Sequence, residues 1–170
     1  MLASTLDKKK YEKICLIDTN KNLAPKIKVS GGAKCNITNE LLSFENYLGD
    51  REFAKELLEN FSKDDLLAFL NKNGVYPKIN PKIVKGTYFC NSSQDVIDMF
   101  AKLTSHVKKF LNTTVKDVHF DKYYKIKTDS IQIEAEKLIV ASGGLSYSVL
   151  GASSIAFDIA KKFEHTIIKL

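Results

Sequence analysis

Arginine is almost missing from this 170-residue chain, in which Arg51 is the only arginine among 26 basic residues. The net charge of +6 therefore comes from lysines, and these are spread along the chain. Recognition of base edges and phosphates relies on the planar fork of arginine. The composition thus favours a solvated lysine surface over a nucleic-acid-binding face, and we expect no nucleic-acid partner.

Cysteine and histidine are also scarce. Cys15, Cys35 and Cys90 form no C-x-x-C pair, and their odd number argues against a disulfide framework. The three histidines are equally scattered, so the sequence predicts no metal site.

Long apolar runs are absent too, because no stretch approaches the roughly 18 residues that a membrane span needs. The N-terminal stretch "MLASTLDKKKYEK" has its apolar residues before its lysines, which is the reverse of a secretory signal. We therefore expect no membrane partner and, by default, a cytoplasmic location.

Two short apolar runs carry the strongest fold signal. Ile14–Ile17 stops at Asp18, and Leu138–Ala141 runs directly into Ser142-Gly143-Gly144. Such runs are typical of strands buried on both faces of a parallel sheet, so we predict an α/β fold in which the two are neighbouring or near-neighbouring parallel strands. Ligands of such sheets bind at the carboxyl ends of strands, where Asp18 could bind a ribose or could simply cap its strand.

Helices and a β-meander are predicted around these strands. One helix should begin after the cap Ser62 and end at Asn73-Gly74. Further helices are expected over 50–60, 94–110 and 154–163, an irregular or hairpin segment over 75–91, and meander strands over 115–120, 124–128 and 131–135.

The loop "VSGGAKCNITN", residues 29–39, is too rich in glycine for a helix and too polar for a core strand. Gly31 and Gly32 allow positive φ angles and a close approach of the backbone to a ligand. Asn36 adds a donor and an acceptor, and Lys26 adds positive charge nearby. Cys35 has no partner cysteine close in sequence, which favours a structural or flavin-adjacent role over redox catalysis.

These motifs resemble those of the BaiN-like flavoproteins, which are NAD(P)/FAD-dependent oxidoreductases. Members show an acidic residue after a strand and then K-x-x-x-S-G-G-G-R-C-N-x-T-N, and here Ala33 and Lys34 replace the third glycine and the arginine. "KLIVASGGLSY", residues 137–147, is similar to the family pattern K-L-I-L-A-T-G-G-x-S-Y. Near Gly151, "GASSIAFDIA" departs from the G-S-T-G-D-G stretch of the family.

The resemblance implies a partial Rossmann-like FAD-binding fold with parallel strands, flanking helices and a β-meander. It implies that Asp18 binds the adenosine ribose and that the backbone of Val115 lies against the adenine. The other cofactor-binding residues that it implies are Lys26, Ser30, Gly31, Gly32, Cys35, Asn36, Ala141, Ser142, Gly143 and Gly144. FAD is the expected cofactor, NAD(P)H the expected reductant and a small molecule the expected substrate, while no catalytic residue is identified.

Residues 1–170 are therefore expected to form a partial FAD-binding domain. The first strand with its G-x-G-x-x-G loop, and the C-terminal substrate and flavin segments, lie outside the family pattern matched here. We expect this chain alone to bind FAD weakly or not at all, and to self-associate through an open sheet edge beside Ile14–Ile17. Two alternatives stay open: an inert remnant that acts as a binding or assembly module, and a flavin-dependent RNA-modifying enzyme.

Overall fold

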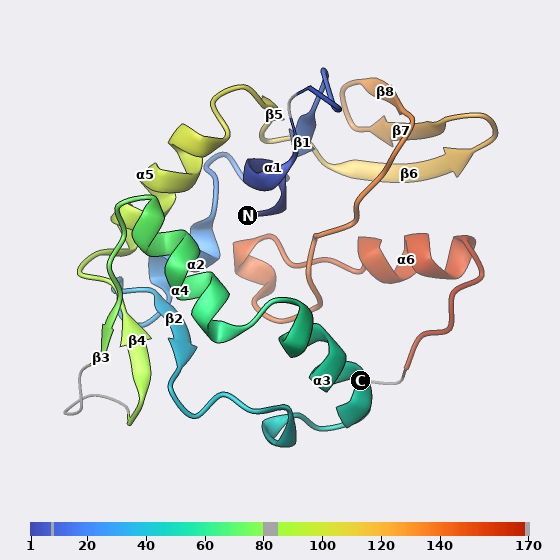
Figure 1. The fold of residues 1–170 in the computed structure, drawn as a ribbon. Coiled ribbons are helices and arrows are strands. Elements are labelled where there is room, and N and C mark those ends of the chain that lie inside the picture. The colour runs from blue at the N-terminus through green and yellow to red at the C-terminus, as the bar shows by residue number, and fades with distance from the viewer. Residues whose placement is uncertain (8, 80–84, 169–170) are drawn as a thin grey trace. The chain divides into compact units, whose positions relative to one another are not determined.

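The computed structural model describes residues 1–7, 9–79 and 85–168 (Figure 1). The chain divides into two compact units. The first unit comprises Met1–Thr5 and Lys26–Ser105. The second unit comprises Leu6–Pro25 and His106–Leu170.

The first unit combines helices with a small antiparallel sheet. Its three strands pair in the order β2-β4-β3, and the predicted hairpin segment supplies β3 and β4, while residues 80–84 lie outside the described part. The elements are α1 (Leu2–Thr5), α2 (Pro25–Val29, which begins at the unit boundary), β2 (Asn36–Asn39), η1 (Phe44–Asn46), α3 (Arg51–Asn60), α4 (Lys63–Lys72), β3 (Lys78–Ile79), β4 (Thr87–Phe89) and α5 (Ser93–Leu103).

Local signals explain where the helices of the first unit begin. The carboxylate of Asp50 accepts a hydrogen bond from the Phe53 amide at the start of α3. Ser62 caps the start of α4, as the sequence predicted, and it forms a reciprocal capping box with Asp65. The core below these helices consists of Cys35, Leu70, Val75, Cys90, Val96 and Met99.

The second unit contains a parallel strand pair and an antiparallel meander. β1 (Cys15–Ile17) pairs in parallel with β5 (Lys108–Phe110). The meander has the order β6-β7-β8 and consists of β6 (Val115–Phe120), β7 (Tyr124–Thr128) and β8 (Gln132–Ala135). The unit also contains η2 (Ser148–Leu150) and α6 (Ile155–Lys162). These elements confirm the predicted α/β fold class and the predicted meander.

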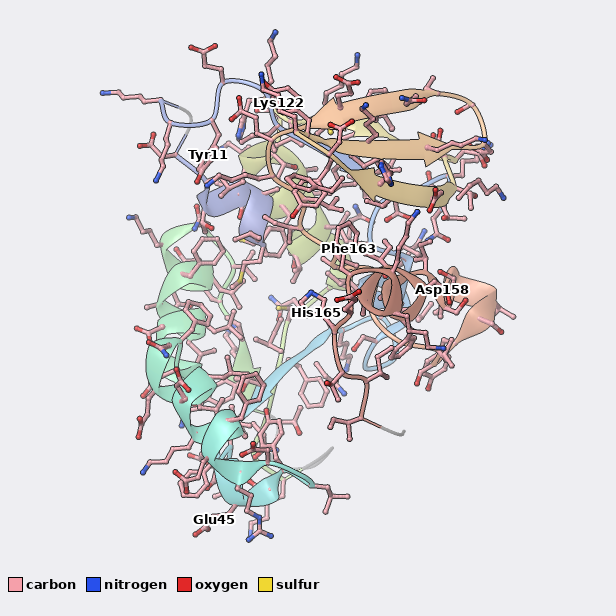
Figure 2. The ribbon with its side chains drawn as sticks, turned by 90° about the vertical axis from the view of Figure 1, so that its right-hand side faces the viewer. Tyr11, Glu45, Lys122, Asp158, Phe163 and His165 are labelled. Carbon is pink, nitrogen blue, oxygen red and sulfur yellow. The ribbon has the colours of Figure 1, made fainter. Side chains whose placement is uncertain are left out.

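Helix α6 is held to the meander by an aromatic contact and an ion pair. Phe163 follows α6 directly and is labelled in Figure 2. Its ring lies 6.0 Å from the ring of Tyr124. The Lys162 ammonium group lies 2.6 Å from the Asp117 carboxylate. Val118 and Ile126 face each other across β6 and β7 and are both buried, so the meander has one covered face.

The prediction of a strand over Leu138–Ala141 is wrong. These residues form no strand, and Ile139 and Val140 are 57% and 42% exposed. β1 instead takes β5 as its parallel partner. An apolar run becomes a strand only when a neighbouring strand satisfies its backbone groups, and within the described residues no strand lies beside this one.

The predicted helix over 94–110 is correct only as far as Leu103. Thr104 ends α5, and its hydroxyl donates to the Phe100 carbonyl at 2.7 Å. The chain then turns, and the amide of Lys108 donates to the Ile14 carbonyl at 3.0 Å as β5 begins. Two apolar residues of the predicted helix are therefore placed otherwise: Val107 directly precedes β5, and Phe110 ends it.

Candidate cofactor site

Asp18 lies directly after β1, at the carboxyl end of the parallel strand pair. Its amide donates to the Phe110 carbonyl at 2.9 Å, and its carbonyl accepts from the Thr113 amide at 3.1 Å. Its backbone is thus held on both sides by the segment that follows β5. This is the position where a doubly wound sheet binds ligands, as the sequence predicted.

The carboxylate of Asp18 is engaged through one oxygen only. Oδ1 accepts from the backbone amide of Asn20 at 2.8 Å and from its side-chain Nδ2 at 3.0 Å. Within the described part of the chain, no hydrogen bond reaches Oδ2. The half-buried side chain therefore retains an acceptor, as binding of a ribose hydroxyl requires.

Asn20 is a site residue that the sequence reasoning missed. Its Nδ2 also donates to the Leu150 carbonyl at 3.3 Å, which joins the end of β1 to the turn at Gly151. The spacing Asp18-x-Asn20 after a strand is a usable local signal, because such side chains often bind a backbone amide two residues on. The contact with Leu150, however, has no local signal.

Val115 is the first residue of β6 and is half-buried. It follows Thr113 by two residues, so the structure brings Asp18 and the segment leading to Val115 together. In the meander Val115 pairs with Thr128. The contact of its backbone with adenine stays a prediction.

The glycine-rich loop of the first unit has an unusual backbone. Positive φ angles occur at Gly31 (57°), Gly32 (63°), Ala33 (68°) and Cys35 (56°). Side chains with a Cβ are strained in this region, so Ala33 carries a cost at the position where the family pattern has glycine. The sequence predicted the freedom of the two glycines but not the extension of the same conformation to Ala33 and Cys35.

Hydrogen bonds hold this loop against the start of α5. The carbonyls of Ala33 and Lys34 accept from the amides of Ser93 at 2.7 Å and Cys90 at 2.9 Å. The Ser30 carbonyl accepts from the Cys35 amide at 2.9 Å. In the described part of the chain, the amides of Gly31, Gly32 and Ala33 have no such partner. Three successive free donors suit an anionic group such as a phosphate.

Ser30 and Asn36 lie together across the loop. The Asn36 amide donates to the Ser30 hydroxyl at 3.3 Å, and the Asn36 side chain packs beside Gly31. Lys26 is exposed on α2, immediately before the loop. The structure therefore groups the predicted polar residues of this motif within the first unit.

The two glycines of the loop allow a matched test. A Cβ on Gly31 would lie 2.2 Å from Asn36 Oδ1 and 3.1 Å from the Asn36 amide nitrogen, whereas a Cβ on Gly32 would meet nothing within 4 Å. We expect Gly32→Ala to cost about 1–2 kcal/mol of unfolding free energy through its φ angle alone, and Gly31→Ala to cost roughly 1 kcal/mol more. Urea denaturation of the two variants measures the difference. Equal losses would show that Asn36 does not pack against Gly31 as described.

Cys35 is buried in the core of the first unit, and a contact with a cofactor stays a prediction. It is 5% exposed and belongs to the core cluster of the first unit. Burial raises the pKa of its thiol, and burial, with Cys35 and Asp95 nearby, raises the pKa of Cys90 to about 11. Both groups are therefore protonated near neutral pH, and a protonated, buried thiol is a poor nucleophile.

Residues Ala141–Gly144 lie in the second unit and are exposed. They have no regular secondary structure, and Gly143 has a φ angle of 74°. The predicted site residues thus fall in both units: Asp18, Val115 and this segment in the second, and Lys26 to Asn36 in the first. Their shared role in binding a cofactor stays a prediction.

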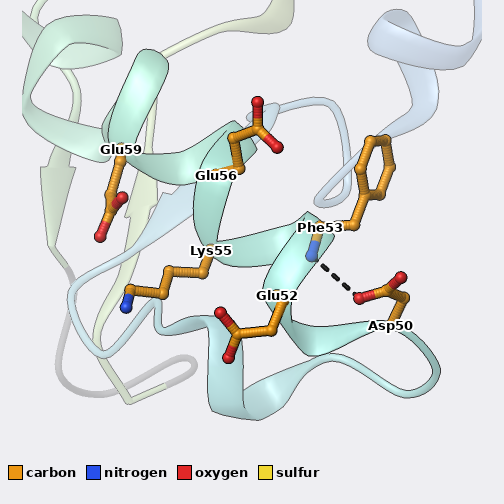
Figure 3. Close-up of a pocket in the computed structure, with 6 residues that line it drawn as sticks. All are labelled: Asp50, Glu52, Phe53, Lys55, Glu56 and Glu59. Atoms are coloured by element: carbon orange, nitrogen blue, oxygen red, sulfur yellow. Dashed lines mark hydrogen bonds between the residues drawn. The ribbon is translucent and has the colours of Figure 1, made fainter.

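A surface hollow lies elsewhere, on α3, and contains none of the predicted residues. It is lined by Asp50, Glu52, Phe53, Lys55, Glu56 and Glu59 (Figure 3). Four of these six residues are acidic, so the hollow disfavours a phosphate-bearing ligand.

Among the residues that the structure describes, no cluster of His, Cys, Asp and Glu suits a metal ion. In the same residues, no helix is long and apolar enough to cross a bilayer.

Comparison with known proteins connects this geometry to a family. The chain is 30% identical to a ribosomal RNA dihydrouridine synthase of Escherichia coli over 96% of its length and 41% of that protein. It is 26% identical to a 3-dehydro-bile acid delta(4,6)-reductase of Clostridium scindens, over 91% of the chain and 38% of that protein. A ribosomal RNA dihydrouridine synthase of Haemophilus influenzae is 27% identical over 91% of the chain and 40% of its own length.

The chain therefore spans about two fifths of the length of these relatives. A family model described as the HI0933-like protein Rossmann domain matches residues 1–170, which is the whole chain. This match confirms the family resemblance that the two glycine motifs predicted. The chain belongs to the HI0933-like Rossmann-domain family.

Proposed function

We propose that this chain is the FAD-binding part of a flavin-dependent oxidoreductase that uses NAD(P)H as its reductant. The observation that carries the proposal is the Oδ2 atom of Asp18, which has no hydrogen-bond partner among the described residues. It lies at the carboxyl end of β1, beside the segment that leads to Val115. Membership of a Rossmann-domain family supports it. The flavin would carry out the hydride transfer, and the protein would bind and orient the flavin.

The residues present fit such a cofactor in two respects. Asp18 offers an acceptor to a ribose hydroxyl. The amides of Gly31 to Ala33, which have no backbone acceptor in the described ranges, offer donors to a phosphate oxygen. Successive positive φ angles, as found in this loop, are typical of backbone segments whose amide groups bind anions without charged side chains. Lys26 would add positive charge near the same group.

Reduction of an unsaturated substrate is the reaction class that we propose. Dihydrouridine is the reduced form of uridine, and the Clostridium relative is named a reductase. A small molecule is the substrate that the lysine-rich, arginine-poor composition favours.

Modification of RNA is a second candidate, because two of the relatives are named ribosomal RNA dihydrouridine synthases. Most of the excess positive charge of the chain also lies in residues 6–25 and 106–170, the second unit. Mass spectrometry of ribosomal RNA from cells with and without the gene separates the two candidates. Loss of dihydrouridine on deletion supports the RNA substrate, and unchanged dihydrouridine supports the small molecule.

The flavin proposal is tested by purifying the full-length protein and identifying any released cofactor by chromatography. We expect FAD rather than FMN, because the features described here suit the ribose and phosphates of the adenosine half. Bleaching of the flavin absorbance on anaerobic addition of NADH or NADPH tests the reductant. A colourless protein that takes up no FAD from solution would contradict the proposal and would favour a binding or assembly module.

A further inference from the structure

The backbone amide, the carbonyl and the side-chain nitrogen of Asn20 are all engaged in hydrogen bonds within the second unit. Its amide and its Nδ2 both donate to Asp18 Oδ1, at 2.8 Å and 3.0 Å. The second hydrogen of Nδ2 points to the Leu150 carbonyl, 3.3 Å away, and the Asn20 carbonyl accepts from the Asn112 amide at 3.0 Å. Because both side-chain partners are oxygen acceptors, only the nitrogen of the carboxamide can face them.

These contacts fix the orientation of the Asp18 carboxylate. Two N–H groups bind the same oxygen, so rotation of the carboxylate would break both bonds. Oδ2 is then held in one direction, and within the described residues no other group competes for it. A fixed acceptor binds a hydroxyl with less loss of side-chain entropy than a mobile one.

Asn20 also packs against the turn that follows η2. A Cβ on Gly151 would lie 2.5 Å from Asn20 Nδ2, and the φ angle of Gly151 is 86°. Glycine is therefore required at this position for two reasons, the conformation and the close approach of Asn20. The carboxamide joins Asp18 to a turn 130 residues away from Asn20 in the sequence.

We infer that Asn20 is a positioning residue that orients the Asp18 carboxylate toward the adenosine ribose and links it to the Leu150–Gly151 turn. This inference rests on the proposed flavin function. Asn20 does not touch the cofactor in this scheme, and it acts through Asp18.

A double-mutant cycle in the full-length protein tests this role. The variants are Asn20→Ala, Asp18→Ala and the double substitution, and the readout is the dissociation constant for FAD measured by flavin fluorescence. We expect Asn20→Ala to raise the Kd about 3- to 10-fold, the effect of one lost hydrogen bond. In the Asp18→Ala background, Asn20→Ala should alter the Kd by less than about 2-fold, because the carboxylate that Asn20 orients is already absent.

Two further variants serve as controls for the role of the Asn20 side chain. Asn20→Asp keeps the shape of the side chain, removes its N–H donors and sets a carboxylate beside Asp18. The Kd of this variant should therefore rise at least as much as that of Asn20→Ala. Asn60→Ala removes an exposed side-chain bond to the Glu56 carbonyl on α3 and should leave the Kd unchanged. Thermal unfolding shows whether each variant is folded.

The outcomes separate the inference from the proposal on which it rests. Equal losses from Asn20→Ala in both backgrounds would indicate a general structural role and overturn the inference alone. An unchanged Kd in both Asn20→Ala and Asn20→Asp would do the same. Failure of the unmutated protein to bind FAD overturns the flavin proposal and the inference together. Should Asn20→Ala not fold, Asn20→Asp and its combination with Asp18→Ala supply the same cycle.

Discussion

Replacing Asp18 with alanine should weaken FAD binding by about 1–3 kcal/mol, which is a change of roughly 5- to 150-fold in Kd. The carboxylate lies at the end of β1 with one oxygen occupied by Asn20 and the other without a partner in the described residues. A ribose hydroxyl that donates to Oδ2 loses its acceptor in the variant. Fluorescence titration of the full-length protein with FAD measures the loss.

The nature of the ligand provides the control for this prediction. FMN lacks the adenosine ribose, so any binding of FMN should be the same in the variant and the unmodified protein. Asp98→Ala removes an exposed carboxylate of α5 that accepts a hydrogen bond from the Gln94 side chain, and it should leave FAD binding unchanged. An unaltered affinity for FAD in Asp18→Ala would refute the ribose role.

The largest loss of stability should come from Leu70→Ala. Leu70 lies on α4, is 1% exposed and belongs to the core cluster that also contains Cys35 of the glycine-rich loop. Truncation of a fully buried leucine removes its transfer free energy and leaves a cavity, so we expect a loss of about 2–5 kcal/mol. Chemical denaturation followed by circular dichroism measures the change in the free energy of unfolding.

Leu57→Ala is the matched control for this substitution. Leu57 lies on the neighbouring helix α3 but is 54% exposed, so its truncation should cost less than about 1 kcal/mol. A similar loss in both variants would mean that Leu57 is covered in solution. A small loss in Leu70→Ala would contradict the core described for the first unit.

Features that depend on neighbouring residues were predictable from the sequence. The capping box of Ser62 and Asp65, the stop at Asn73-Gly74 and the meander strands all follow from residues a few positions apart. The same holds for the placement of Asp18, because a short apolar run that ends in an acidic residue is a local pattern. These elements specify themselves through backbone conformation and short-range hydrogen bonds.

Features that depend on distant partners were not predictable in this way. Leu138–Ala141 is as apolar as Ile14–Ile17. Among the described residues, however, only Ile14–Ile17 has a strand beside it. Apolar character alone cannot show which of the two segments pairs with another strand. In the same way, Val107 and Phe110 fit a helical spacing but lie in or beside β5 because Ile14 offers its carbonyl to Lys108. Asn20 was missed because its second acceptor, Leu150, lies far along the chain.

The unequal exposure of the three thiols has a practical consequence for chemical labelling. Cys15 is exposed on β1, whereas Cys35 and Cys90 are buried and have raised pKa values. A maleimide or nitroxide reagent applied to the folded protein should therefore modify Cys15 first, without any need to remove the other cysteines. Burial also raises the pKa of Cys15, so mildly alkaline buffer should speed the reaction. The attached probe would sit three residues before Asp18 and would report spectroscopically on ligands that arrive at that end of the strand.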